Sequence, residues 1–483
     1  MNSGTPLQIP GYFWDAEKGR YFKLENDQHT PPGNPQHWWS SNIRMKRKRD
    51  EDAAAARAHH EARNSSRITH SRALNEPLMG GFLAREHGDN VRDLCSASFA
   101  QGLVENGTLF ATLRSRIGPY VNLQAMFVQN KKNKDGMYSV FTNDANTIRK
   151  GSFGIDDKTG RYRYCANHLF TCDLGRWLVS SSSLITDIKC DATETNVFVA
   201  SASMGVGHKI AFFRMVYGGL PAQVQICRDT NRIPYILPNT ICVSPPGHIN
   251  QCLVGTNLGL AAFHEDSLSL ITPTFPGYTE DFQPSPFKDI FSVDYHAANP
   301  NVMYFGGRPG KLFIGDIRQD AYGWNSVQLR SSIAHLKAVN EHQFLVAGLN
   351  NMMAVYDIRF CNRVGFENIQ NGPQKPGHHL GGNPIVTMPK YKNLSRLDTG
   401  LDYDRNSGVV AAAHDDGRVA LYSVRSGCRL PSRDIDRIHS PREHIHCLQF
   451  QTLEGDHTPT LFVGDGDSVY TFPFGVDEID DES

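Results

Sequence analysis

Two short stretches of the chain end in the same three residues. Asp316-Ile317-Arg318 closes the apolar run "GKLFIGDIR", and Asp357-Ile358-Arg359 closes "NMMAVYDIR", so that the two aspartates lie 41 residues apart. A carboxylate at the end of a strand accepts hydrogen bonds from the turn that follows it. The planar donor fork of arginine recognises carboxylates and backbone carbonyls, and arginine is enriched among interface hot spots. The chemistry that this pattern predicts is recognition of another protein.

The aspartate and the arginine of each stretch have different explanations. Asp316 and Asp357 are best explained structurally, as acceptors that tie the strand end to its turn. Arg318 and Arg359 lie beyond the apolar run and predict a two-arginine patch on one edge of the molecule. The alternative is a solvated strand end or a local ion pair with the aspartate. Arg425 in "YSVRSG" follows Ser423 where the other copies have Asp, so it is a weaker third copy.

Other stretches of the chain contain residue types that can carry catalysis or metal binding. Cys165, His168 and Cys172 lie close together in "CANHLFTC", but zinc needs a fourth ligand and tighter cysteine spacing, so buried thiols explain them better. "GVGHK" is a hairpin turn, because a phosphate-binding loop would need a helix after it. No GxSxG, HExxH or EF-hand pattern occurs. We expect no catalytic residue, no metal site and no cofactor.

The elements that position the arginines belong to an internal repeat. A strand ending in small residues, a tight polar turn and a second strand recur six times, from "NVFVASASMGVGHKIAFFRM" to "PTLFVGDGDSVYTFPFG". A period of roughly 40–45 residues is typical of a propeller whose blades are four-stranded sheets. With an irregular first unit within residues 92–153, the sequence predicts an all-β WD-repeat propeller of seven blades. Six and eight blades are the alternatives.

The repeated strands are apolar on both faces, as expected for a sheet between two other sheets. Met353 and Val355 point one way, and Ala354 and Tyr356 point the other. "GGFLARE" (Gly80–Glu86) is predicted to close the ring by joining the last blade. The longer spacing from Asp357 to Ser423 predicts an insertion, which we assign to the loops "GPQKPGHHLGGNP" and "KNLSRLDTGLDYDRN".

The N-terminal region differs in kind from the repeat. Residues 1–36 are polar and contain a hairpin motif, "IPGYFWDAEKGRYFKL". Residues 37–78 form a helical arm that has no apolar stripe and is therefore either solvent-bridging or ordered on a partner. Residues 79–475 make up the propeller and 476–483 an acidic tail. The arm carries a basic cluster, which we interpret as a nuclear import signal or otherwise as a solvated helix face: Arg44, Lys46, Arg47, Lys48 and Arg49.

Composition excludes several classes of partner. The formal net charge is −1, so no bulk field favours nucleic acid or membrane. No run approaches the roughly 18 apolar residues of a membrane span, and the N-terminus has no secretory pattern. The ten cysteines are scattered singly, which is typical of reduced thiols in an intracellular protein. We expect no membrane contact, no direct nucleic-acid binding, and a location in nucleus and cytoplasm.

The strand ends also resemble a known family. "FLVAGLNNMMAVYDIR" is similar to a sixteen-residue box ending in Trp/Tyr-Asp-x-Arg that is found in WD-repeat substrate receptors of cullin-4 RING ubiquitin ligases. "MYFGGRPGKLFIGDIR" fits less well, because Gly315 replaces the aromatic residue. The whole chain resembles the cullin-four-associated factors, including the N-terminal hairpin motif ahead of a helical arm.

This resemblance implies that the box residues face the damaged-DNA-binding adaptor of the ligase, with the helical arm as a second contact. The adaptor-binding residues would be Asp316, Arg318, Tyr356, Asp357, Arg359 and, more weakly, Arg425. The chain would be a non-catalytic receptor that holds an unknown protein substrate on its opposite edge or long loops, near the conjugating enzyme. One alternative is a WD-repeat scaffold of another nuclear complex without a ligase role. A propeller enzyme and a nucleic-acid binder led by the arm are others, and they predict turnover or strongly salt-dependent binding.

Overall fold

A computed structural model of the chain describes residues 12–15, 20–23, 45, 48–49, 91–110, 123–132, 136–144, 147–155, 161–173, 183–191, 196–203, 211–216, 222–223, 225–226, 237–264, 267–272, 287, 289–361, 364–365, 382–440 and 444–475. The chain divides into two compact units, residues 1–68 and 69–483. Within the described residues, no helix is long and apolar enough to cross a membrane.

The first unit contains the predicted hairpin. Strand β1 (Tyr12–Asp15) pairs antiparallel with β2 (Arg20–Lys23), and the aromatic residues Phe13 and Phe22 lie opposite each other. Of the arm, Met45, Lys48 and Arg49 are described, and all three are helical. The hairpin prediction is confirmed, and the rest of the arm lies outside the described residues.

In the described residues the second unit is built from seven sheets, which are antiparallel apart from one short added strand and which we number as blades in chain order. Blade 1 holds β4 (Met126–Val128), β5 (Tyr138–Asp144), β6 (Thr147–Ile155) and β7 (Tyr162–Asp173). Blade 2 holds β8 (Ser183–Cys190), β9 (Asn196–Ser203), β10 (Ala211–Val216) and β11 (Ala222–Gln223). Blade 3 holds β13 (Pro238–Val243), β14 (Cys252–Thr256), β15 (Leu260–His264) and β16 (Ser267–Leu270), with β12 (Gln225–Ile226) added parallel to β16.

The remaining blades repeat this pattern. Blade 4 holds β17 (Ile290–Tyr295), β18 (Val302–Gly307), β19 (Lys311–Asp316) and β20 (Asn325–Gln328), with β24 (Val364–Gly365) outside β20. Blade 5 holds β21 (Ile333–Ala338), β22 (Gln343–Gly348), β23 (Met353–Asp357) and β25 (Val386–Thr387). Blade 6 holds β26 (Leu401–Asp404), β27 (Val409–Ala413), β28 (Val419–Ser423) and β29 (Arg429–Leu430). Blade 7 holds β30 (Cys447–Gln451), β31 (Thr460–Asp465), β32 (Ser468–Phe472) and β3 (Thr108–Phe110).

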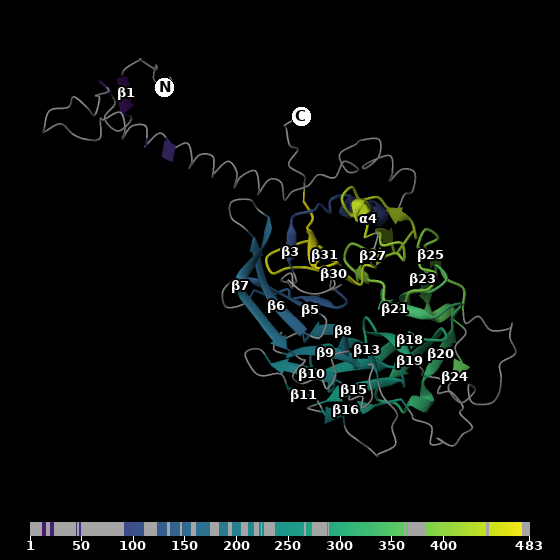
Figure 1. The fold of residues 1–483 in the computed structure, drawn as a ribbon. Helices are drawn as coiled ribbons and strands as arrows, with labels where there is room; N and C mark the ends of the chain where they lie inside the picture. Colours follow the sequence, from purple (N-terminus) through teal and green to yellow (C-terminus); the bar gives the residue numbers. More distant parts are fainter. Residues whose placement is uncertain are drawn as a thin grey trace. The chain divides into compact units, whose positions relative to one another are not determined.

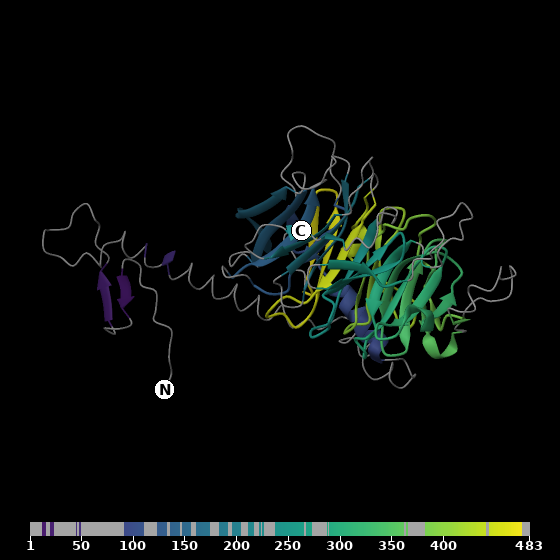
Figure 2. The same cartoon turned by 90° about the horizontal axis from the view of Figure 1, so that it is seen from below.

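The seven blades follow one another around a ring (Figure 1). One helix, α4 (Val91–Gln101), and three short 3-10 turns, η4 (Ala321–Gly323), η5 (Ile358–Phe360) and η7 (Ile435–Arg437), accompany them in the described part. Seen after a turn of 90°, α4 lies beside the C-terminal part of the ring (Figure 2). The predicted all-β propeller and its seven-blade form are both confirmed.

Hydrogen bonds from side chains join the first strand of each blade to the first strand of the next. Because first strands of neighbouring blades do not pair through their backbones, polar side chains supply the missing partners. In chain order of the blades, the bonds join Gln129 to Cys190, Asp187 to Ile241, Asn239 to Ile290, Asp294 to Ala338, Lys337 to Asp402, Asp402 to Phe450, and Gln449 to Val128. The last of these closes the ring between blade 7 and blade 1.

The blades bury both faces of their central strands. All five residues of β23 are buried. Met353 and Val355 pack in the apolar core shared with blade 6, while Ala354 and Tyr356 pack in the core shared with blade 4. The predicted alternation of these side chains is therefore confirmed.

The segment that closes the ring differs from the prediction. Strand β3 is the fourth strand of blade 7 and pairs with β32, Leu109 opposite Val469. Gly80–Glu86, which we expected in this place, lies outside the described residues. The irregular first unit predicted within 92–153 is confirmed in part, because "YVNLQAMFV" and "GMYSVFT" supply β4 and β5 of blade 1. Its first stretch, "TLFATLRSRI", supplies β3 of blade 7 instead, and blade 1 extends to Asp173 at the end of β7.

Two further expectations about the propeller region are corrected. The loop "KNLSRLDTGLDYDRN", assigned to the insertion, contains β26, the first strand of blade 6. Residues 79–475 were expected to be all-β, but α4 lies in that range. Phe99 and Ala100 of α4 are buried in the core of blades 6 and 7, and Phe99 stacks on Phe474. The helix was missed because its buried side includes small polar residues such as Ser96 and Ser98.

Candidate protein-docking site

The two predicted aspartates end equivalent strands of neighbouring blades. Asp316 ends β19 and Asp357 ends β23, the third strands of blades 4 and 5. Each carboxylate accepts a hydrogen bond from the backbone N–H two residues on, Asp316 from Arg318 at 3.0 Å and Asp357 from Arg359 at 2.9 Å. The predicted structural role of the aspartates, holding the turn after the strand, is confirmed.

Each arginine folds back onto its own aspartate with a side-on fork. Arg318 donates from Nε to Asp316 Oδ1 at 2.9 Å and from Nη2 to Oδ2 at 2.6 Å. Arg359 makes the same two bonds to Asp357, at 3.0 and 2.7 Å. The Arg318 side chain is 61% exposed and the Arg359 side chain 56% exposed. The local ion pair considered from the sequence is present, and it leaves the outer edge of each guanidinium facing solvent.

The fork fixes the charge of the carboxylates as well as the position of the arginines. The hydrogen bonds from Arg318 lower the pKa of Asp316 below its usual value, and those from Arg359 lower the pKa of Asp357. Both acids therefore stay ionised at neutral pH. An arginine held by its own carboxylate loses less side-chain entropy when a partner binds it.

Tyr356 lies in the core and not on the surface. Its ring is buried and stacks on Phe344, with ring centroids 5.8 Å apart. Asp357 is 2% exposed, so neither residue contacts a partner directly. Asp357 instead positions Arg359 through its carboxylate.

The glycine that replaces the aromatic residue in blade 4 has a structural reason. A Cβ atom on Gly315 would lie 2.9 Å from the Trp324 ring. Trp324 follows η4, is buried, and donates from Nε1 to the carbonyl of Asp316 at 3.1 Å. Trp324 thus fills the space beside Gly315 and holds the same strand end.

Phe360 is a surface residue that the sequence reasoning missed. It ends η5 directly after Arg359 and is 69% exposed. The Arg359 guanidinium carbon lies 5.7 Å from the centroid of its ring. Its position one residue beyond a strand-end Asp-x-Arg is the signal that could have found it. We call the edge that carries Arg318, Arg359 and Phe360 the arginine rim.

The turns between first and second strands complete the arginine rim. Ile317 donates its N–H to the Asn301 carbonyl in the turn of blade 4, and Ile358 donates to the His342 carbonyl in the turn of blade 5. His296 donates from Nε2 to the carbonyl of Glu341 at 2.6 Å and so joins the two turns. The rim of blades 4 and 5 is therefore one braced surface.

The third copy of the pattern is covered by the chain itself. Ser423 takes the place of the aspartate and accepts the backbone N–H of Arg425 at 3.2 Å. Its hydroxyl donates to Asp93 of α4 at 3.0 Å, and Ser96 donates to the Ser407 carbonyl in the neighbouring turn. Arg425 is half-buried. The structure brings Arg318 and Arg359 into equivalent open positions and sets Arg425 apart from them.

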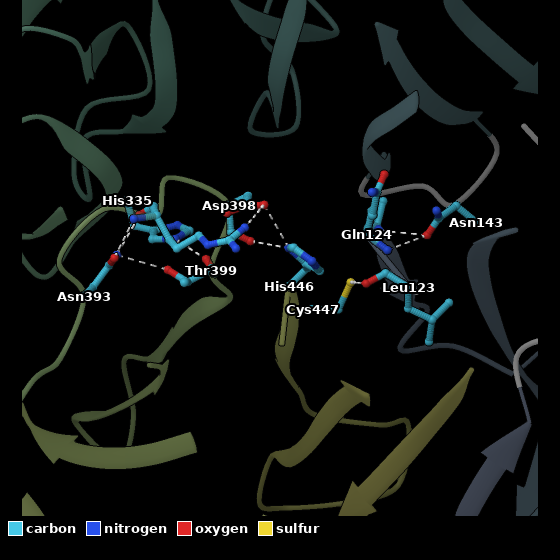
Figure 3. Close-up of polar contacts among 11 residues, drawn as sticks. Leu123, Gln124, Asn143, His335, Asn393, Asp398, Thr399, His446 and Cys447 are labelled. Carbon is cyan, nitrogen blue, oxygen red and sulfur yellow. Dashed lines mark hydrogen bonds and ion pairs between the residues drawn. The ribbon is translucent and has the colours of Figure 1, made fainter. Parts of the chain in front are cut away.

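A second polar cluster lies where the first strands of blades 5, 6 and 7 begin (Figure 3). His335 bonds the Thr399 carbonyl, and His446 bonds the Asp398 carbonyl at 2.6 Å. Burial lowers the pKa of His335 to about 4, so it is neutral at pH 7. Each histidine braces the loop before β26, and this arrangement explains them without a reaction.

The other candidates from the sequence gain no support as sites. Cys165, His168 and Cys172 lie on β7, and no group of three metal-ligating side chains is found among the described residues. Among the described residues, free thiols include those of Cys95, Cys242, Cys252, Cys428 and Cys447. In the basic cluster, Lys48 and Arg49 are exposed, while Arg44, Lys46 and Arg47 lie outside the described residues, so nuclear import stays a prediction.

Comparison with known proteins agrees with the fold. No protein-family model matches the chain. It is 22% identical to WD repeat-containing protein 21 of Schizosaccharomyces pombe over 451 residues, which cover 90% of this chain and 91% of the relative. It is also similar to the crystal structure of the WD40 β-propeller domain of Doa1, with a TM-score of 0.45, 10% identity, and coverage of 76% of this chain and 97% of that one. The ring of seven sheets and the similarity along nearly the whole chain support a WD-repeat β-propeller, an architecture that serves as a protein-interaction scaffold.

Proposed function

We propose that the chain is the substrate-receptor subunit of a cullin-4 RING ubiquitin ligase, which docks on the damaged-DNA-binding adaptor through its arginine rim. The observation that supports this function most is the pair of identical Asp-x-Arg forks in neighbouring blades. Arg318 and Arg359 have the same three bonds to their aspartates and both remain more than half exposed. Two arginines that are held in equivalent positions on neighbouring blades can contact a single partner surface together.

The arginine rim carries the chemistry that an interface hot spot needs. Each side-on fork uses Nε and one Nη2 proton, which leaves three N–H groups for carbonyls or carboxylates of the adaptor. Phe360 adds an exposed aromatic ring beside Arg359, and both aromatic residues and arginine are enriched at protein interfaces. We infer that Phe360 enters an apolar pocket of the adaptor while the arginines fix the register.

The receptor acts by proximity in this proposal. The adaptor holds one rim, so the opposite rim and its loops stay open for a protein substrate. Binding there raises the effective concentration of substrate lysines near the conjugating enzyme. The chain itself makes and breaks no covalent bond.

A scaffold role in another nuclear complex is the second candidate. It is favoured by the same forks, because an arginine already paired with its own aspartate can be a structural cap of the strand end. In that case the strand ends contribute stability and no adaptor contact.

Co-purification from cells separates the two functions. Wild type is compared with Arg318→Ala/Arg359→Ala and with Arg330→Ala/Arg418→Ala, which removes two exposed arginines from the opposite rim. We expect the adaptor and a cullin to accompany wild type and the control, and to be lost from the folded Arg318→Ala/Arg359→Ala variant. Absence of the adaptor from every sample would reject the ligase role and leave the scaffold.

A further inference from the structure

The loop Pro389–Thr399, which joins blade 5 to blade 6, presents an exposed leucine on a rigid backbone. Leu394 is 62% exposed. Its N–H donates to Asp415 Oδ2 at 2.8 Å, and its carbonyl accepts from the N–H of Asn350 at 3.2 Å. Asp415 lies in the β27–β28 turn and Asn350 in the β22–β23 turn, so two neighbouring blades hold this one residue.

The residue before Leu394 anchors the loop from within. Asn393 is fully buried, and its N–H donates to Asn351 Oδ1 at 2.7 Å while its carbonyl accepts from the Asn351 N–H at 2.8 Å. Its side chain donates to the Arg396 carbonyl at 2.7 Å and accepts from the Arg396 N–H at 2.9 Å. It also bonds Thr399 at the end of the loop (Figure 3). The loop is therefore already ordered in the free protein, so that a partner that binds it need not order its backbone.

An apolar side chain that is held in water gains nothing for the fold. Burial of a leucine side chain stabilises a fold, and Leu394 forgoes most of that stabilisation although its backbone is fixed. Single exposed apolar residues are common on protein surfaces, so what distinguishes Leu394 is its fixed backbone and the basic side chains around it. We take Leu394 as the apolar centre of a protein-binding surface.

The charges around Leu394 favour an acidic partner. The loop carries Lys390, Lys392 and Arg396 against one acid, Asp398, and all four are exposed. The neighbouring turns add Arg330 and Arg418 against Asp415 and Asp416. Asp415 is engaged by the Leu394 N–H, Lys392 lies 3.6 Å from Asp416, and Arg396 lies 3.9 Å from Asp398. The last two pairs are loose, so basic charge remains for a partner.

This surface lies on the rim opposite the arginine rim. The β22–β23 turn that holds Leu394 and the Asp357–Arg359 turn stand at opposite ends of β23. The five residues of that strand separate them by about 16 Å. A partner on one rim leaves the other free.

We propose that the loop Pro389–Thr399 is a docking surface for an acidic protein segment that places an apolar side chain against Leu394. The segment's carboxylates pair with Lys390, Lys392 and Arg396. The inference rests on the proposed function in one respect only, that the segment belongs to the ligase substrate.

A phage-displayed library of random peptides, panned on the full chain, tests the proposal. Three proteins are compared: wild type, Leu394→Ser, and Phe360→Ser as the matched loss of an exposed apolar residue on the other rim. We expect enriched peptides to combine Asp or Glu with Leu, Ile, Phe or Met. Their affinity should fall about tenfold or more with Leu394→Ser and stay unchanged with Phe360→Ser. Lys392→Glu/Arg396→Glu should weaken acidic peptides and strengthen their Lys-substituted versions.

Other outcomes overturn the proposal. They are enriched peptides without acidic residues, equal affinity for wild type and a Leu394→Ser variant of unchanged melting temperature, or no enrichment over that variant. Adaptor binding is measured on the same proteins. Leu394→Ser should retain the adaptor and Phe360→Ser should lose it. If wild type itself binds no adaptor, the ligase role fails while the peptide result still decides whether the loop is a docking surface.

Discussion

Several contacts join blade 7 to blade 1, and the loss of one of them, the pair of hydrogen bonds made by the Gln449 side chain, has a calculable effect. Gln449 of β30 accepts the N–H of Val128 at 2.8 Å and donates to the Val128 carbonyl at 3.1 Å. Val128 is fully buried. The backbone N–H of Gln129 donates to the Ser139 carbonyl of β5. Since the backbone groups of successive residues point to opposite sides of a strand, the N–H and carbonyl of the preceding residue, Val128, point away from β5. In the described structure Gln449 is the partner that completes the edge of β4.

Replacing Gln449 by Leu removes both bonds and keeps a similar volume. The buried N–H and carbonyl of Val128 are then left without a partner, and each unpaired group costs about 1–3 kcal/mol, so we expect a loss of about 2–6 kcal/mol in the free energy of unfolding. The destabilisation should be confined to blades 7 and 1, because the two bonds join only these blades. Hydrogen exchange should accelerate in β3, β4 and β30–β32 and stay unchanged in β17–β23.

Urea unfolding followed by circular dichroism measures the total, and hydrogen exchange with mass spectrometry measures its distribution. Gln451→Leu, two residues on in the same strand, is the matched control, since the described structure gives it no bond across the seam. The reasoning is refuted if Gln449→Leu costs no more than Gln451→Leu, or if exchange accelerates evenly around the ring.

Three further predictions concern the strand ends and a buried histidine. In the wild type, Arg359 Nη2 lies 2.7 Å from a carboxylate oxygen of Asp357, and Asp357→Asn places an amide N–H₂ there instead. A binding titration should then show adaptor affinity falling severalfold although Arg359 is intact. Affinity equal to that of the control Asp416→Asn would argue against positioning of the arginine by the fork. His414 is buried and bonded to Tyr422, and burial lowers its pKa to about 4. As pH falls, the unfolded chain therefore takes up a proton at this histidine before the folded chain does, and about 3 kcal/mol of the free energy of unfolding should be lost between about pH 6.5 and pH 4. The melting temperature of His414→Gln should depend less steeply on pH than that of wild type. Parallel plots of melting temperature against pH for the two proteins would contradict this. Asp93→Ala deprives the buried Ser423 hydroxyl of its acceptor, which should cost about 1 kcal/mol and speed hydrogen exchange in α4, whereas Cys95→Ala on the exposed side of the helix should not.

The fold was largely predictable because its signal is local and repeated. The alternation of Met353 and Val355 with Ala354 and Tyr356 predicts a strand buried on both faces, and the structure packs them in two separate cores. The recurrence of that pattern predicts the ring. The alternation of apolar residues can be recognised in a single sequence, because each strand shows it separately.

The contacts that complete the ring depend on partners far apart in the chain. Ser423 meets Asp93 across 330 residues, and Gln449 meets Val128 across 321. Helix α4 was hidden for the same reason, because its buried side includes Ser96, which bonds Ser407. Neither residue type nor spacing marks such pairs before the fold brings them together.

The candidate site was predictable in part. The Asp-x-Arg pattern located the exposed arginines and the caps that hold them. It did not show that Trp324 fills the space beside Gly315 or that α4 covers the third copy, and it placed Tyr356 among the adaptor-binding residues although its ring lies in the core. These features come from packing between blades, which a pattern along one strand does not contain.

Docking of the adaptor on the arginine rim is tested most directly with purified proteins. Biolayer interferometry would measure the affinity of the damaged-DNA-binding adaptor for wild type, Arg318→Ala/Arg359→Ala and the opposite-rim control Arg330→Ala/Arg418→Ala, each with its melting temperature checked. We predict that wild type and the control bind alike and that the Arg318→Ala/Arg359→Ala protein binds about thirtyfold or more weakly. Equal affinity of all three folded proteins, or no binding by wild type, would contradict the proposed docking.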